Sequence, residues 1–227
     1  MDYSASHSYP QRFARMILGL LLCGTGTYMT VQATAIGIGA WETFQTGLSM
    51  RTGLSFGNCT VIVSFCVIAV DLLLGGKIGF GTLFNAVMVG KIVDLYHAYL
   101  DFIPLTDSVW IGSLYLVLGR FLSGYGMVVY MAPALGCGPR DTLMVVLGNR
   151  FPDRGIGTVR FVMDMAVFLA GVLLGAPYGI GTVVATACQS YVMAFVFRLC
   201  HFESRTVPHE NVAETLRRIR RGKHGLS

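Results

Sequence analysis

The chain of 227 residues is 54% hydrophobic and only 13% charged, and its mean hydropathy is +0.62. Soluble domains carry about 25% charged residues, so this composition excludes an ordinary soluble enzyme. At about 20 residues per crossing, the length suffices for about six membrane helices, and the continuous apolar runs exclude a barrel of alternating strands.

Hydropathy predicts six membrane spans. In chain order they cover about residues 13–33, 57–74, 82–99, 109–131, 157–174 and 181–199. Two glycine-rich turns, residues 75–79 and 175–179, join the second span to the third and the fifth to the sixth. Glycine supplies the positive φ that such tight turns require. The sequence therefore predicts an all-α membrane protein with no second globular domain.

The basic residues predict how these spans are oriented. With a cytoplasmic N-terminus, Arg12, Arg15 and the arginine-rich segment 140–160 all lie on the cytoplasmic side, and Arg51 lies on the opposite side. The positive-inside rule therefore places both termini in the cytoplasm. This topology explains most of the net charge of +5, so no nucleic-acid partner is expected.

The tail, residues 201–227, is polar and basic. Val212, Leu216 and Ile219 recur at helical spacing opposite the arginines. This pattern predicts an amphipathic helix that rests on anionic lipid headgroups, and a helix that docks a partner protein is the alternative.

Residues 1–100 and 101–200 form two similar halves. A shift of about 100 residues aligns segments 24–26 with 124–126, 37–43 with 136–142, and 74–82 with 174–182. Three matches at nearly one offset indicate a duplication. Each half holds three spans, an odd number, so the second half must enter the membrane from the opposite side. Inverted three-helix repeats of this kind are typical of secondary transporters, although channels and non-transporting proteins also contain them.

A short segment follows the first span and the fourth span of this pattern. In each, a Gly-x-Gly is followed by a ten-residue stretch that starts with an acid and ends with an arginine, Glu42 to Arg51 and Asp141 to Arg150. Ten residues are too few to cross a bilayer but fit a re-entrant or interfacial helix, whose dipole favours an acid first and a base last. Either Glu42 and Asp141 only cap these helices, or the two helix starts line a shared site at the midplane.

Charged residues also lie inside the predicted spans. Arg120 falls in the middle of the fourth span, where an unpaired guanidinium costs at least about 2.5 kcal/mol, so it must face the bundle interior or water. Lys91 and Asp94 share one face of the third span. We expect Asp94 to pair with Lys91, Arg120 or both. The set is either a neutralised structural network or a solute or proton site in which Arg120 contacts an anionic group.

Three further polar residues complete the candidates. Asp164 is expected to pair with Arg160 one turn earlier, with proton titration as the alternative, and Asp71 is expected to reach the headgroups. Asn85 faces another helix or a cavity, with hydrogen bonding between helices as its default role. The candidate solute-binding residues are Glu42, Asp141, Arg120 and Asn85, and the candidate ion- or proton-coupling residues are Asp94, Lys91 and Asp164.

Several of these segments together resemble a family of bacterial membrane proteins, the YczE/YyaS/YitT family. The resemblance covers about residues 12–198 and rests on segments 37–42, 54–57, 79–82, 136–141, 157–160 and 179–182. It implies a multi-pass protein of the bacterial cytoplasmic membrane and brings no settled substrate or reaction. The chain departs from the expected pattern at Ala40 and Trp41, where we expect a proline like Pro139.

Two functions fit the sequence. The first is a permease or secondary transporter for an unidentified small solute, and the second is a non-transporting scaffold or regulator that docks a cytoplasmic partner on segment 140–160 and the tail. The sequence shows no nucleophile–base pair and no metal spacing among its six cysteines and five histidines. We therefore expect no enzyme, no metal and no cofactor; the expected partners are the lipid bilayer and a small solute, and a homo-oligomer is compatible with the sequence.

Overall fold

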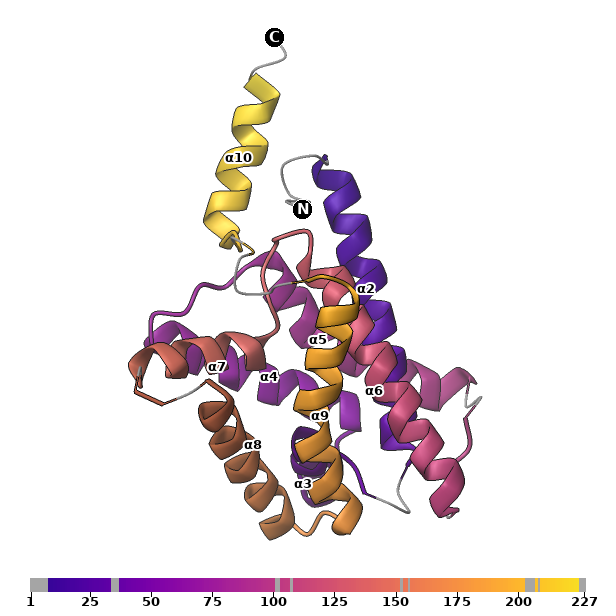
Figure 1. Cartoon of the computed structure of the whole chain (residues 1–227). Helices are drawn as coiled ribbons and strands as arrows, with labels where there is room; N and C mark the ends of the chain where they lie inside the picture. Colours follow the sequence, from indigo (N-terminus) through magenta and orange to yellow (C-terminus); the bar gives the residue numbers. More distant parts are fainter. Residues whose placement is uncertain are drawn as a thin grey trace.

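The computed structural model describes residues 8–33, 37–100, 103–106, 108–151, 153–154, 156–202, 207 and 209–224, and all regular structure within them is helical. The elements, seen in Figure 1, are α2 (Tyr9–Val31), α3 (Ala40–Thr52), α4 (Phe56–Leu73), α5 (Phe80–Leu95), the π-helix η1 (Tyr96–Leu100), α6 (Val109–Met131), α7 (Pro139–Arg150), α8 (Ile156–Leu173), α9 (Ile180–Leu199) and α10 (Val212–His224). All six apolar stretches and both short segments are therefore helices, as predicted. The largest shifts in helix ends are at α2, which begins at Tyr9, and α5, which gives way to η1 at Tyr96.

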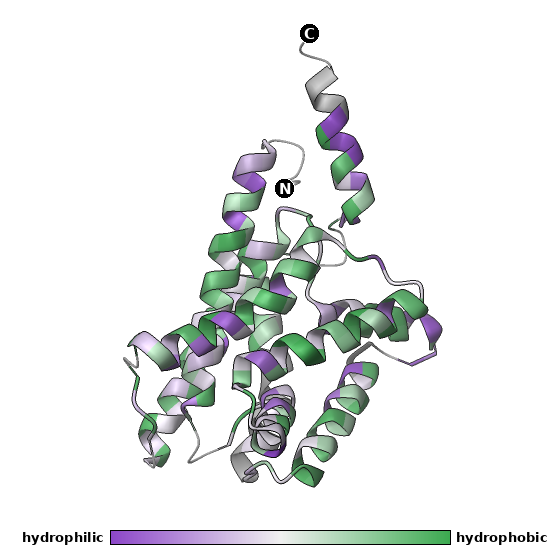
Figure 2. Ribbon diagram, turned by 180° about the vertical axis from the view of Figure 1, so that it is seen from behind, coloured by the Kyte–Doolittle hydropathy of each residue, from purple (hydrophilic) through white to green (hydrophobic). Residues whose placement is uncertain are grey.

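Three helices in the described part of the chain are long and apolar enough to cross a membrane, namely α2, α4 and α6. Hydrophobic residues, green in Figure 2, make up much of the helices of the bundle. Large apolar side chains there are more than four-fifths exposed, among them Leu73, Tyr99, Trp110 and Leu173. Such a surface suits acyl chains and not water, so the fold is that of a membrane protein.

The most extensive helix pairing in the bundle is that of α2 with α6. Gly19 faces the backbone of Tyr130, and Gly26 faces Gly119, so the residue numbers rise along α2 as they fall along α6 and the helices run antiparallel. Glycines let two backbones approach this closely, as in many membrane bundles. Met16 and Leu20 pack beside this contact in a fully buried cluster.

The two short helices start at glycine N-caps and pack against the opposite half of the chain. α3 begins after Gly39 and packs chiefly on α8, whereas α7 begins after Gly138 and packs chiefly on α4. The chain reaches each start through a glycine with positive φ, 110° at Gly37 and 125° at Gly136, a conformation that side chains other than glycine rarely adopt.

The start of the tail is buried rather than laid on a surface, which corrects part of the prediction. The carboxylate of Glu210 pairs with Arg12 Nη2 at 2.9 Å and with Arg218 Nη1 at 3.2 Å, and the Glu210 amide donates to Ala134 O. Burial also lowers the pKa of His209 to about 4, which leaves this imidazole neutral at pH 7. These contacts fix the tail to the start of α2 and to the loop after α6. The helix α10 projects from that end of the molecule (Figure 1). Predicted tail residues 203–206, 208 and 225–227 lie outside the described residues.

The α2–α6 contact yields a prediction from two glycines on one helix. A Cβ on Gly126 would lie 2.7 Å from the Cys23 backbone nitrogen, whereas a Cβ on Gly124 would meet nothing closer than a Val196 methyl at 3.4 Å. We expect Gly126→Ala to destabilise the protein by about 1–3 kcal/mol, because backbone atoms cannot yield as side chains can. Gly124→Ala is the matched control, expected to be neutral. Thermal unfolding in detergent, followed by circular dichroism, compares them, and equal midpoints would contradict the packing.

Candidate functional site

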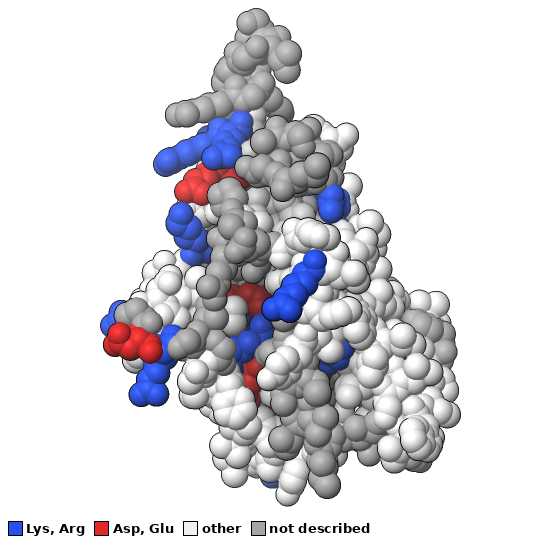
Figure 3. All heavy atoms as spheres, in the orientation of Figure 1, with Lys and Arg blue, Asp and Glu red and all other residues white. Residues whose placement is uncertain are grey.

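A cavity of about 130 Å³ lies inside the bundle, between residues of the two halves of the chain. Six charged side chains line it, namely Glu42, Arg120, Arg140, Asp141, Arg160 and Asp164. A single water needs about 10–15 Å³ of such volume, so the cavity has room for several waters or one small solute. On the face seen in Figure 3, charged atoms of both signs gather near the middle, surrounded by uncharged ones.

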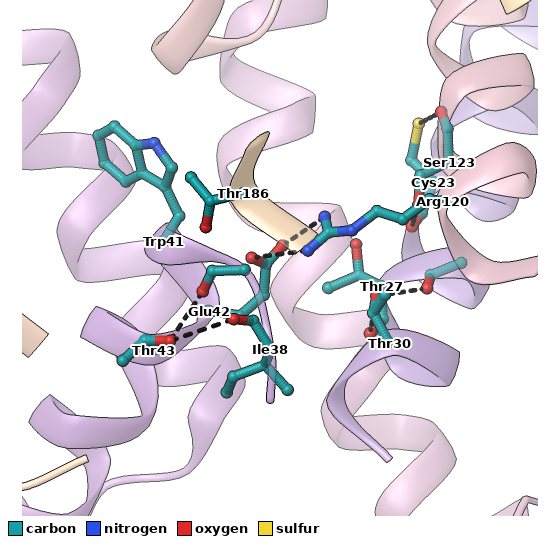
Figure 4. A network of polar contacts seen from close by, with 12 residues as sticks. Cys23, Thr27, Thr30, Ile38, Trp41, Glu42, Thr43, Arg120, Ser123 and Thr186 are labelled. Atoms are coloured by element: carbon teal, nitrogen blue, oxygen red, sulfur yellow. Dashed lines mark hydrogen bonds and ion pairs between the residues drawn. The ribbon is translucent and has the colours of Figure 1, made fainter. Parts of the chain in front are cut away.

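The deepest pair in this cavity joins Glu42 to Arg120. Arg120 Nη1 and Nη2 each donate to one carboxylate oxygen of Glu42 at 3.3 Å, and the side chains are 8% and 6% exposed (Figure 4). Two parallel hydrogen bonds of this kind match the planar shapes of both groups. Arg120 thus faces the bundle interior, as predicted, but its partner is Glu42 and the expected pairing with Asp94 is wrong.

Asp164 is held by two partners on the same side of the cavity. Trp41 Nε1 donates to Asp164 Oδ1 at 2.9 Å, and Arg160 Nε lies 3.8 Å from Asp164 Oδ2. The predicted pair with Arg160, one turn earlier on α8, is confirmed. The bond from Trp41, on α3, could not be expected from the sequence because it crosses from one half of the chain to the other.

Arg140 differs from the two other arginines of the cavity. Its guanidinium lies over the indole ring of Trp41, 4.6 Å from the centroid, in a cation–π contact. No hydrogen bond or ion pair connects it to any residue within the described ranges. Asp141, the next residue, also faces the cavity, near the Tyr130 hydroxyl that accepts a hydrogen bond from Gly138 N at 2.9 Å.

Two amide side chains also line this cavity. Gln45, on α3, is 1% exposed, and neither atom of its amide has a hydrogen-bond partner in the part of the chain that is described. Asn85, on α5, faces the cavity, which is one of the two predicted alternatives. Sequence reasoning missed Gln45, Trp41 and Arg140. The available signal was helical spacing, because Trp41 and Gln45 lie one turn apart on α3, the short helix that begins at Ala40.

Lys91 and Asp94 lie elsewhere, and their predicted pairing is wrong. Asp94 accepts hydrogen bonds from Ser55 Oγ at 2.6 Å and from the Gly57 amide at 2.8 Å, while Lys91 donates to Asn58 Oδ1 at 2.6 Å. Both side chains therefore tie α5 to the first turn of α4. The free N–H groups at a helix N-terminus attract a carboxylate, which explains why Asp94 binds there and not to Lys91 or Arg120.

Asp71 does not reach the headgroups, contrary to expectation. Its side chain is fully buried, and neither carboxylate oxygen has a partner among the residues that the structure describes. The turn after α4 explains this, because the Gly76 amide donates to the Asp71 carbonyl at 2.7 Å and folds the chain back over the end of the helix.

An all-helical fold with an apolar exterior and a charged interior cavity defines a membrane protein, and comparison with known proteins gives its family. The chain belongs to a family of unknown function (DUF6198), whose model matches residues 10–198. It is 28% identical over 186 residues to the uncharacterised membrane protein YczE of Bacillus subtilis, covering 81% of this chain and 84% of that protein. It is 30% identical over 199 residues to an uncharacterised protein of Haemophilus influenzae, covering 86% and 87%.

A third relative is the uncharacterised protein YyaS of Bacillus subtilis, 25% identical over 182 residues, which are 79% of this chain and 89% of that protein. No solved structure matches the chain. The predicted resemblance to YczE and YyaS is therefore confirmed.

The Glu42–Arg120 pair leads to a second prediction. Removing one partner of a buried pair leaves a bare charge, so Glu42→Gln and Arg120→Met should each lower the unfolding free energy by about 3–5 kcal/mol. The double variant should lose less than the sum, because neither charge then remains. Reversible unfolding in mixed detergent micelles measures this cycle, with Arg150→Gln at the exposed end of α7 as the control. Additive losses would mean that the two groups do not interact.

Proposed function

We propose that this protein is a permease, a secondary transporter that moves a small solute across the bacterial cytoplasmic membrane by alternating access. The observation that carries this proposal is the cavity, which is enclosed by both halves of the chain and lined by charged and amide groups that the described protein atoms leave partly unpaired. In this proposal six spans, α2, α4, α5, α6, α8 and α9, form two inverted repeats, residues 1–100 and 101–200, and both termini face the cytoplasm.

Local geometry recurs at equivalent positions of the two halves, which supports a structural repeat. The turns after α4 and α8 have φ values of 84° at Gly75 and 90° at Gly175. The next helix starts in the same way in each half, because the Gly79 amide donates to Thr82 Oγ1 at 3.3 Å and the Gly179 amide donates to Thr182 Oγ1 at 3.3 Å.

Contacts between the halves support an inverted arrangement. Cys23 Sγ donates to Ser123 O at 3.4 Å, and Ser123 Oγ donates to Cys23 O at 3.5 Å, so two residues that are equivalent at an offset of 100 make reciprocal bonds. α3 packs on α8 as α7 packs on α4, and α2 runs antiparallel to α6. A twofold axis that passes between Cys23 and Ser123 would relate each of these contacts to its counterpart in the other half. Two repeats related in this way can exchange conformations and open to either side.

The short helices fit re-entrant segments in this scheme. Glu42 in the first turn of α3 and Asp141 in the first turn of α7 both line the cavity, whereas Arg51 and Arg150 at the far ends are exposed. Each helix would then start at the centre of the membrane and end at one surface. Backbone of this kind is tolerated at membrane depth where it is buried in protein or lines a cavity.

The scaffold hypothesis is supported by one feature, the exposed arginines of α10. Arg217, Arg218 and Arg220 face outward and could bind an acidic partner. Segment 140–160 has fewer arginines available to a docked partner than its sequence suggested, because Arg140 and Arg160 face the cavity.

Inverted repeats make a topological prediction that needs no substrate. In a background from which the natural cysteines have been replaced, Arg51→Cys should react with a membrane-impermeant maleimide added to intact cells only from outside the cytoplasmic membrane. Arg150→Cys, at the equivalent end of α7, should react only in inside-out vesicles. Labelling of both positions from the same side would exclude the inverted arrangement.

Flux through proteoliposomes tests transport itself. We expect gradient-driven uptake of at least one labelled probe from a panel of carboxylates, amino acids, sugars and amines, and Asp141→Asn should reduce it about tenfold or more, because that carboxylate lines the cavity. Asp153→Asn, an exposed aspartate nearby, is the matched control, and deletion of α10 should leave the flux intact. Absence of flux for every probe class at all pH values and potentials would contradict the permease. A phenotype that depends on α10 alone would favour the scaffold.

A further inference from the structure

We propose that the cavity is a binding site for a small monovalent carboxylate, held by the Arg140 guanidinium where it lies over the Trp41 ring. This inference names a substrate class for the proposed permease and so builds on that function, although binding can be tested without transport. Its basis is that Arg140 and Gln45, which line the cavity, have no hydrogen-bond partner within the described chain, whereas the two other arginines of the cavity are ion-paired.

Three arginines line the cavity, and the structure pairs two of them. Arg120 is bound by Glu42 at 3.3 Å, and Arg160 lies 3.8 Å from Asp164. Arg140 has no ion-paired acid among the residues described, and its guanidinium carbon lies 4.6 Å from the centroid of the Trp41 ring. A guanidinium carries five N–H donors, and no described residue accepts a hydrogen bond from Arg140, so these donors are available to a planar acceptor.

Trp41 is a fixed platform for this interaction. Its indole nitrogen donates to Asp164 Oδ1 at 2.9 Å, and its side chain is 8% exposed in a cluster with Val63 and Val67. Because a hydrogen bond fixes the indole nitrogen and apolar packing fixes the rest of the ring, the indole holds the guanidinium in a defined position above it. A preorganised donor loses little conformational entropy when a ligand binds.

Gln45 provides an independent sign that the cavity takes a ligand. Its side chain is 1% exposed, yet both amide atoms lack partners within the described part of the chain, and it lines the same space as Arg140. Arg120 Nε, in the same cavity, is likewise without a partner there. Buried donors without acceptors are costly, and a carboxylate supplies acceptors to both side chains.

The charges around the cavity select a single negative charge. The three arginines and the three acids, Glu42, Asp141 and Asp164, sum to zero, and Asp141 is adjacent to Arg140 in the chain. A dianion such as phosphate would be attracted about twice as strongly by the arginines and repelled about twice as strongly by the three acids, so a cavity of zero net charge gives it no electrostatic advantage over a monoanion. The volume of about 130 Å³ further restricts the ligand to about ten heavy atoms at most, at about 10–15 Å³ for each water-sized group.

Trp41 also supplies the readout. The chain has two tryptophans, so Trp110→Phe leaves Trp41 as the sole indole fluorophore of the full-length protein in detergent. Sodium acetate, at constant ionic strength, should change its emission saturably and raise the thermal midpoint, because a ligand that binds only the folded state stabilises it. Acetamide has a similar shape without the charge and should do neither.

Variants of α7 identify the ligand-binding group. Arg140→Gln should raise the half-saturating acetate concentration about tenfold or more, and Arg140→Lys should fall between, because lysine keeps the charge but loses the planar fork. Arg150→Gln, an exposed arginine on the same helix, is the matched control and should bind like the parent. The thermal shift guards against a direct effect of each substitution on the Trp41 emission.

The other outcomes distinguish failure of the carboxylate site from failure of the permease. Equal responses to acetate and acetamide, or unchanged acetate binding by Arg140→Gln, would overturn the proposal, as would inorganic phosphate binding more tightly than acetate. Acetate binding without flux of any probe would contradict the permease and leave the site. Flux of a neutral probe without acetate binding would contradict the site and leave the permease.

Discussion

A guanidinium in the middle of an apolar bundle has to be neutralised, and this requirement determines the geometry around Arg120. Its partner Glu42 stands 78 positions earlier and belongs to the other half of the chain. Both groups are nearly excluded from solvent, so salt screens their attraction little and the loss of either leaves an uncompensated charge. The pair therefore holds the start of α3 against the middle of α6 and sets where the cavity lies.

Close backbone approach is the condition for that pair to form. Gly39, the N-cap of α3, lies directly against the guanidinium of Arg120 and the carboxylate of Glu42, where a Cβ would collide with both. Its φ is −67°, so glycine is needed here for space and not for an unusual backbone conformation. The glycines between α2 and α6 act in the same way, because they bring the helix that carries Arg120 close to the end of the helix that leads to Glu42.

The sequence predicted features that depend on local spacing and failed where distant segments meet. Hydropathy located the long helices, the spacing of Glu42 to Arg51 located a short helix, and the i, i+4 relation located the Arg160–Asp164 pair. It also gave Glu42, Asp141, Arg120 and Asn85 as solute-binding candidates and Asp164 as a coupling candidate, and the structure places all five around one cavity. Membrane depth alone could not separate Glu42 from Asp94 as the partner of Arg120, since depth gives no position around the bundle.

The misplaced residues share a physical reason. Asp94 and Lys91 are bound by the first turn of α4, and Asp71 is enclosed by the turn that follows the same helix, so backbone groups and chain reversal decide their surroundings. These contacts depend on how α4 and α5 lie together, and neither hydropathy nor charge reports that arrangement. Gln45 and Arg140 were missed because a polar residue in a short helix usually faces water, and only the three-dimensional packing of α3 and α7 shows them facing inward.

The difference between polar groups with and without hydrogen-bond partners indicates that the cavity holds an occupant. Asp94, Asp164 and Glu210 each have two or more partners, as expected for groups that stabilise a fold. Gln45 and Arg140 have no hydrogen bond to the described protein, and both line the same cavity as the satisfied Glu42–Arg120 pair. An unpaired buried polar group costs about 1–3 kcal/mol. Asp71 and His209 are also buried without partners in the described chain but lie outside this cavity, whereas Gln45 and Arg140 share it. Their collection in one space between the two halves therefore points to an occupant, either water or the solute that displaces it.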